Sequence, residues 1–163
     1  MIRMITSFFG AGLLPKAPGT WGSLAALPVG WLLHGLGGPI LLGAATIAAF
    51  VLGVWATKEF TKGSDDHDPS EIVIDEVVGM WIALMPLSLG MWYMGASAWT
   101  FPYPGWITAF IMFRIFDIWK PWIIGWADRM HTPMGVMLDD VLAGIMAALV
   151  VVGAAALAHT VFM

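Results

Sequence analysis

Five carboxylates are the side chains of this sequence best suited to chemistry. They form two adjacent pairs and one isolated acid within an apolar segment: Asp75-Glu76, Asp139-Asp140 and Asp117. Burying several carboxylates together is costly unless a cation compensates their charge. The chain has no Cys and only four His, and such an oxygen-rich ligand set favours Mg²⁺ or Mn²⁺ over Zn²⁺. We therefore predict that these five acids hold a divalent metal ion.

Each adjacent acid pair is expected to begin an apolar helix, and a glycine follows it closely. Gly79 lies four residues after Asp75, and Gly144 lies four residues after Asp140. The helix dipole stabilises an acid at a helix N-terminus by roughly 0.3–1 kcal/mol, which is enough to explain a single such acid. It does not explain two pairs and a further acid within a membrane segment. The glycines would let another helix or a substrate approach the carboxylates.

A second group of candidate residues lies on one face of a predicted helix. Arg114, Asp117 and Lys120 are spaced i, i+3 and i+6. Only seven residues separate Trp106 from Arg114, too few to cross a bilayer, so this helix is expected to carry charge to membrane depth before Pro121 kinks or ends it. A self-neutralising Arg114–Asp117 pair is the simplest interpretation. The other acids favour a binding role for these charges.

The segment 10–23 is rich in Gly and Pro and is predicted to be an ordered loop, with Thr20 or Ser23 capping the helix that follows. One interpretation is a plain connector. Another is a phosphate cradle of backbone N–H groups and Lys16, although the Gly-Lys-Ser/Thr ending of a P-loop is missing. The candidates to bind phosphate oxygens are therefore Lys16, Thr20, Arg114, Lys120 and Arg129.

Long stretches without charged side chains separate these candidates, namely 17–57, 77–113 and 141–163. A helical crossing needs about 20 apolar residues. The first stretch is expected to form two segments joined by a turn at 34–39, the second two segments joined at 97–105, and the third one crossing. Whether the very first segment crosses or re-enters is left open. We predict an all-α integral membrane protein, a compact bundle of about five membrane segments forming a single domain over 1–163.

Composition supports this assignment, since 60% of the residues are hydrophobic and only 11% are charged. In the predicted arrangement all seven Lys and Arg lie on one side, which the positive-inside rule places in the cytoplasm. The absence of Cys excludes a thiolate nucleophile. A net charge of −4 without a basic stripe argues against a nucleic-acid partner.

Four segments in series carry a resemblance that spans nearly the whole chain: 10–23, 74–81, 113–122 and 135–144. Together they resemble the phosphatidylglycerophosphatase A family. The resemblance implies a Mg²⁺-dependent phosphatase in the bacterial cytoplasmic (inner) membrane, multi-pass and with its active site facing the cytoplasm. It would convert phosphatidylglycerophosphate and water to phosphatidylglycerol and phosphate. The matching acidic positions are Asp75, Glu76, Asp117, Asp139 and Asp140, and the matching basic positions are Lys16, Arg114 and Lys120.

The expected chemistry is attack by a metal-activated water, with four of the acids taking part in catalysis: Asp75, Glu76, Asp117 and Asp140. A phospho-aspartate intermediate is the alternative. Another lipid or isoprenoid phosphate is an alternative substrate. A small ion-coupled transporter is an alternative of a different class, but it would string its acids across the bilayer, whereas these acids gather on one side. The expected partners are the lipid substrate and membrane lipids, and a homo-oligomer is left open.

Overall fold

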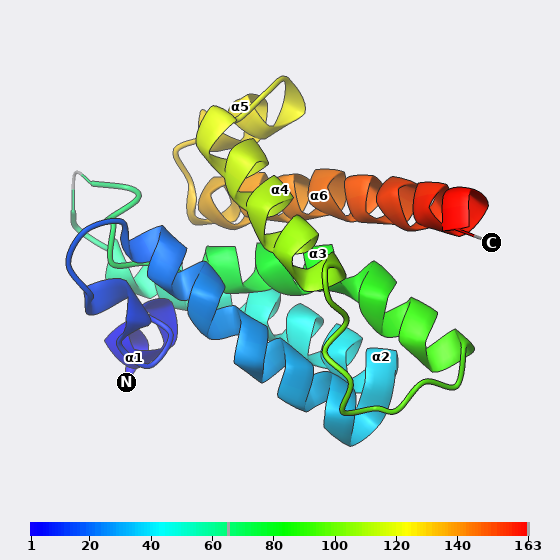
Figure 1. Ribbon diagram of the computed structural model, residues 1–163. Coiled ribbons are helices and arrows are strands. Elements are labelled where there is room, and N and C mark those ends of the chain that lie inside the picture. The colour runs from blue at the N-terminus through cyan, green and yellow to red at the C-terminus, as the bar shows by residue number, and fades with distance from the viewer. Residues whose placement is uncertain (65, 163) are drawn as a thin grey trace.

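The computed structural model describes residues 1–64 and 66–162, without the side chains of residues 159, 161 and 162. In these residues every element is helical, which confirms the predicted all-α class (Figure 1). The elements are α1 (Ile2–Thr6), a 3-10 turn η1 (Ala11–Leu13), α2 (Pro18–Phe60), α3 (Ile74–Tyr93), α4 (Gly105–Trp119), α5 (Ile123–Asp128) and α6 (Pro133–Phe162).

Helix α2 is a hairpin of two helical halves. Its regular geometry breaks at Gly37, with φ −154° and ψ 18°, and at Gly38, with φ 61° and ψ −155°. The positive φ of Gly38 suits glycine, and a Cβ there would lie 2.6 Å from the Trp92 ring. Figure 1 shows the two halves running in opposite directions from this point. The turn predicted at 34–39 is therefore confirmed.

Among the described residues, three helices are long and apolar enough, by length and composition, to cross a membrane: α2, α3 and α6. Helix α4 has 15 residues, which at about 1.5 Å per residue is short of a bilayer core of about 30 Å. The connection 94–104 between α3 and α4 overlaps the predicted break at 97–105. The total of about five segments and the cytoplasmic orientation stay predictions.

Helix α3 is the centre of the bundle and contacts α2, α4 and α6. Its core side chains, among them Val77, Met80 and Ala83, are fully buried. Large apolar side chains of α6, such as Leu149 and Leu157, are exposed instead. The charged segments lie toward the left and the top of Figure 1, whereas the α2 turn, the α3–α4 connection and the C-terminus lie toward the right.

Two predicted helix starts were wrong. Helix α6 begins at Pro133, more than one turn before Asp139, because proline suits the first helical position and the Thr132 hydroxyl accepts a hydrogen bond from the Gly135 N–H at 3.0 Å.

Helix α2 likewise begins at Pro18, so Thr20 and Ser23 lie inside it and neither caps it. The Ser23 hydroxyl donates to the Gly19 carbonyl at 2.8 Å. The residue before the helix, Ala17, has a left-handed backbone, as does Lys16.

Candidate active site

The crossing of α3 and α6 depends on two glycines that face each other. A Cβ on Gly79 would lie 2.6 Å from the carbonyl oxygen of Asp140, and a Cβ on Gly144 would collide with the carbonyl oxygen of Gly79. Only glycine permits this approach of backbone to backbone. Because Asp75 precedes Gly79 by one helical turn and Asp140 precedes Gly144 by one turn, the crossing brings acids of both helices together.

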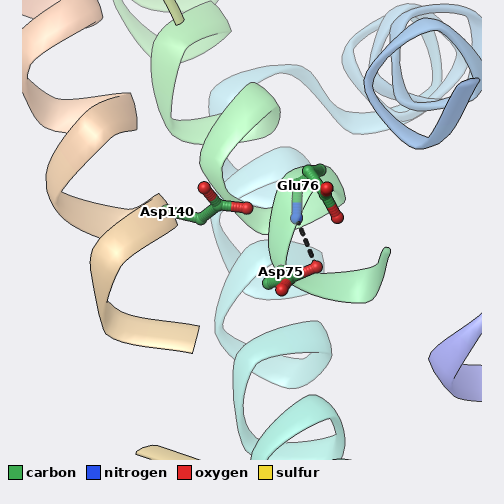
Figure 2. Close-up of side chains that lie close together, drawn as sticks. All are labelled: Asp75, Glu76 and Asp140. Carbon is green, nitrogen blue, oxygen red and sulfur yellow. Dashed lines mark hydrogen bonds between the residues drawn. The ribbon is translucent and has the colours of Figure 1, made fainter. Parts of the chain in front are cut away.

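Three of the predicted acids form a tight cluster, shown in Figure 2. Asp75, Glu76 and Asp140 each offer a carboxylate oxygen, and these oxygens all lie within 4.8 Å of one another. Asp75 is 7% exposed and Asp140 3% exposed. The Glu76 N–H donates to Asp75 Oδ1 at 2.9 Å, but Glu76 Oε2 is buried without a hydrogen-bond partner. A buried, partly unsatisfied set of three carboxylates fits a divalent cation with oxygen ligands.

The cluster opens into a polar cavity of about 650 Å³, counted to its open mouth. All five predicted acids line it, together with Arg114 and Lys120. The other lining residues are Ala17, Pro18, Gly19, Asp68, Ser70 and Ile72. The cavity therefore joins the start of α2, the loop before α3, and helices α3, α4 and α6 at the charged end of the bundle.

Arg114 forms one wall of this cavity. Its Nη1 lies 2.5 Å from Asp117 Oδ2 and donates a long hydrogen bond, 3.5 Å, to the Ser23 hydroxyl. Its Nε is buried and has no partner. A Cβ on Gly19 would come within 3.2 Å of Arg114 Nη1 and would collide with the Glu76 carboxylate. The expected Arg114–Asp117 pair thus exists, and it holds a guanidinium beside the acid cluster with donor capacity left over.

Lys120 binds two carboxylates. Its Nζ donates to Asp139 Oδ2 at 2.7 Å and also to Asp128 Oδ1. Burial disfavours the charged amine, but the hydrogen bonds to both carboxylates outweigh this effect, and the pKa of Lys120 is raised above its ordinary value. Asp139 is therefore already paired with a cation and lies outside the three-acid cluster.

Three of the predicted phosphate-binding residues do not line the cavity. Lys16 lines a neighbouring hollow that also contains Arg3 and Glu71. Thr20 lies inside α2, and Arg129 is exposed at the end of α5. No sequence prediction placed Asp68 or Ser70 in the cavity, whereas Gly19 belongs to the segment 10–23 for which a phosphate cradle was one interpretation. The acidic loop around Asp68 had the composition of a solvated connector, so no strong signal marked it.

The fold and the site together define a class: a helical membrane protein with a buried, metal-type carboxylate cluster beside an arginine. The sequence model of the phosphatidylglycerophosphatase A family matches residues 4–155, and the chain belongs to this family. It is therefore an enzyme, a lipid phosphatase that hydrolyses phosphoric monoesters. The resemblance drawn from the four segments is confirmed.

The sequence is similar to those of curated relatives over most of their length. A phosphatidylglycerophosphatase A of Escherichia coli is 41% identical over 142 residues, 86% of this chain and 75% of the relative. The protein of that name from Haemophilus influenzae is 38% identical, covering 92% of this chain and 86% of the relative. A relative from Bacteroides thetaiotaomicron, 37% identical over 87% of this chain and 86% of its own, is named provisionally as a phosphatidylinositol-3-phosphatase. No solved structure matches the chain.

Proposed function

We propose that this protein hydrolyses the phosphomonoester of phosphatidylglycerophosphate and releases phosphatidylglycerol and phosphate. The observation that carries the proposal is the cluster of Asp75, Glu76 and Asp140 beside Arg114 in one cavity. The family and the relatives from E. coli and H. influenzae support this choice of lipid.

The three clustered carboxylates would hold the divalent ion, for which Mg²⁺ is proposed because every ligand is a carboxylate oxygen. The unpartnered oxygen of Glu76 is an acceptor that such an ion would satisfy. When bound, the ion would supply positive charge for the phosphate and activation of the attacking water. Asp117 and Asp139, also predicted as ligands, are instead paired with Arg114 and Lys120. Their part in metal binding stays a prediction.

The phosphate-binding role falls first to Arg114. Its partly buried guanidinium has an Nε–H without a partner, and charge-assisted hydrogen bonds to non-bridging oxygens are strong in such a setting. Asp117 fixes the direction of this guanidinium through the ion pair on the same helix. Lys120 lies at the cavity but must share its ammonium group with two carboxylates. Roles for Lys16, Thr20 and Arg129 stay predictions.

The proposed location is the bacterial cytoplasmic membrane, with the cavity facing the cytoplasm, because all Lys and Arg lie near one end of the bundle. The phosphate of a membrane lipid lies at the membrane surface, where this orientation places the cavity. Another lipid phosphate is the second candidate substrate, favoured by the name of the B. thetaiotaomicron relative. An ion-coupled transporter is disfavoured because the clustered acids occupy one end only.

The test is phosphate release from phosphatidylglycerophosphate by the purified protein, with Mg²⁺ and with EDTA. Glu76→Gln and Asp140→Asn are expected to abolish release in folded protein. Glu59→Gln is the control: Glu59 lies outside the cavity and pairs with Lys62, and its removal should leave release intact. Phosphate release that persists in EDTA would contradict the proposal that hydrolysis needs a divalent metal ion. Release only from phosphatidylinositol 3-phosphate would keep the site and change the substrate.

A further inference from the structure

A polar hollow of about 830 Å³, counted to its open mouth, lies beside the acid cavity. The connection from η1 to α2 lines one side of this hollow, and the loop before α3 lines another. Two residues, Pro18 and Ser70, line both the hollow and the acid cavity, so the two spaces are neighbours across a common wall. A molecule bound in the acid cavity can therefore extend past this wall into the second hollow.

Lys16 is the cation of this hollow that has no carboxylate partner among the described residues. The other cation, Arg3, binds Glu71 through Nε and Nη2, at 2.8 and 2.7 Å. Asp66, the second acid of the hollow, accepts a hydrogen bond from the Asp68 N–H at 3.1 Å. The ammonium group of Lys16 is thus available to an anion, and Lys16 does not line the acid cavity itself.

The common wall adds two hydrogen-bond donors. Ser70 is exposed, and its hydroxyl makes no hydrogen bond within the described part of the chain. Helix α2 begins at Pro18, so the N–H of Gly19 has no intrahelical acceptor, and no other acceptor for it occurs among the described residues. Donors of this kind suit the oxygens of a phosphate group.

Apolar side chains stand next to the free cation. Leu13 and Leu14 line the same hollow and are 49% and 45% exposed. Exposed apolar side chains beside a lysine are typical of surfaces at the boundary between lipid headgroups and hydrocarbon. In phosphatidylglycerophosphate the phosphomonoester is the group farthest from the acyl chains, and a phosphodiester joins the headgroup to the diacylglycerol. The hollow therefore suits the phosphodiester, as the acid cavity suits the phosphomonoester.

We propose that Lys16 binds the phosphodiester of the substrate, and that it thereby favours lipids with a second phosphate between the reacting phosphomonoester and the acyl chains. This inference rests on the proposed function, which puts the reacting phosphate in the acid cavity. Phosphatidylglycerophosphate and phosphatidylinositol 3-phosphate both have this order of groups. Phosphatidic acid does not, because its phosphomonoester is attached directly to the diacylglycerol.

The test compares the full protein with Lys16→Gln in mixed micelles, by initial rates of phosphate release from phosphatidylglycerophosphate. The reaction leaves the phosphodiester unchanged, so a contact to it stabilises the ground state and the transition state equally. We expect KM to rise about 10-fold and kcat to stay unchanged. Lys16→Arg keeps a cation that binds phosphate and should restore most of the affinity. Lys62→Gln, the matched control, removes an exposed lysine that lines neither space and should keep the KM of the unaltered protein.

Phosphatidic acid, added as a competitor, separates binding of the phosphodiester from binding of the phosphomonoester. Its inhibition constant should be the same for the unaltered protein and for Lys16→Gln, because it has no phosphodiester to lose. An unchanged KM in Lys16→Gln, a fall in kcat alone, or an equal rise in KM and in this inhibition constant would overturn the proposal. Absence of release by the unaltered protein would instead reject the proposed substrate, and phosphatidylinositol 3-phosphate would then replace it in the same comparison.

Discussion

Gly144→Ala tests whether the contact of α3 with α6 sets the geometry of the carboxylate cluster. The new Cβ would lie 3.0 Å from the Cα and from the carbonyl carbon of Gly79, and closer still to its oxygen, whereas ordinary contacts begin at 3.4 Å. Backbone atoms cannot turn aside, so the helices must part by on the order of 1 Å in a close-packed core. A displacement of about 1 Å can cost about 10²-fold in rate. Overpacking also costs about 1–3 kcal/mol of stability.

We therefore expect Gly144→Ala to lower kcat about 10²-fold and to raise the Mg²⁺ concentration needed for half-maximal activity, because Asp140 moves away from Asp75 and Glu76. The assay is phosphate release from phosphatidylglycerophosphate over a Mg²⁺ titration. Gly153→Ala is the control, since nothing lies within 4 Å of a Cβ there. Folded Gly144→Ala protein with the metal dependence and kcat of the control would refute the reasoning.

Three other perturbations have defined outcomes. Arg114→Lys keeps the positive charge but loses the planar guanidinium with its paired N–H donors. We expect the initial rate of phosphate release to fall about 10²-fold or more while the protein stays folded. Lys120→Gln leaves the buried Asp139 without its cation; thermal unfolding should show a loss of about 1–3 kcal/mol, and adding Asp139→Asn should restore part of it. Mg²⁺ at 100 times its Kd should stabilise the folded protein by about 2.7 kcal/mol and so raise its Tm. Glu76→Gln should reduce this rise in Tm. Equal rises in both proteins would reject Glu76 as a ligand.

Local rules of the sequence predicted much of this architecture. Charge-free stretches of sufficient length became helices, and Gly37-Gly38 broke the longest of them where glycine could adopt a conformation that other residues resist. The glycines at i+4 from the acids indicated a close approach, which the Gly79–Gly144 contact provides. These features depend on properties of a few neighbouring residues, so the sequence alone was enough.

The partner of each charged side chain was harder to predict, because it depends on packing between distant segments. Asp139 and Asp140 are neighbours in sequence, yet Asp139 binds Lys120 while Asp140 joins Asp75 and Glu76. Nothing in the spacing distinguishes the two. The helix α6 also begins earlier than predicted, because the fixed φ of Pro133 suits the first helical position, six residues before Asp139.

The α2 hairpin has a consequence for how the protein enters a membrane. Its turn, the connection 94–104 and the chain after Asp140 contain no Lys, Arg, Asp or Glu, while Lys16 precedes the hairpin and Lys58 lies in its last turn. Moving a charged side chain to the bilayer centre costs about 2.5–3.5 kcal/mol on insertion scales. In the proposed orientation, biogenesis translocates no charged side chain. We infer that the first hairpin inserts as a unit, and that Lys16 and Lys58, on its cytoplasmic side in this orientation, favour the direction in which the later segments insert.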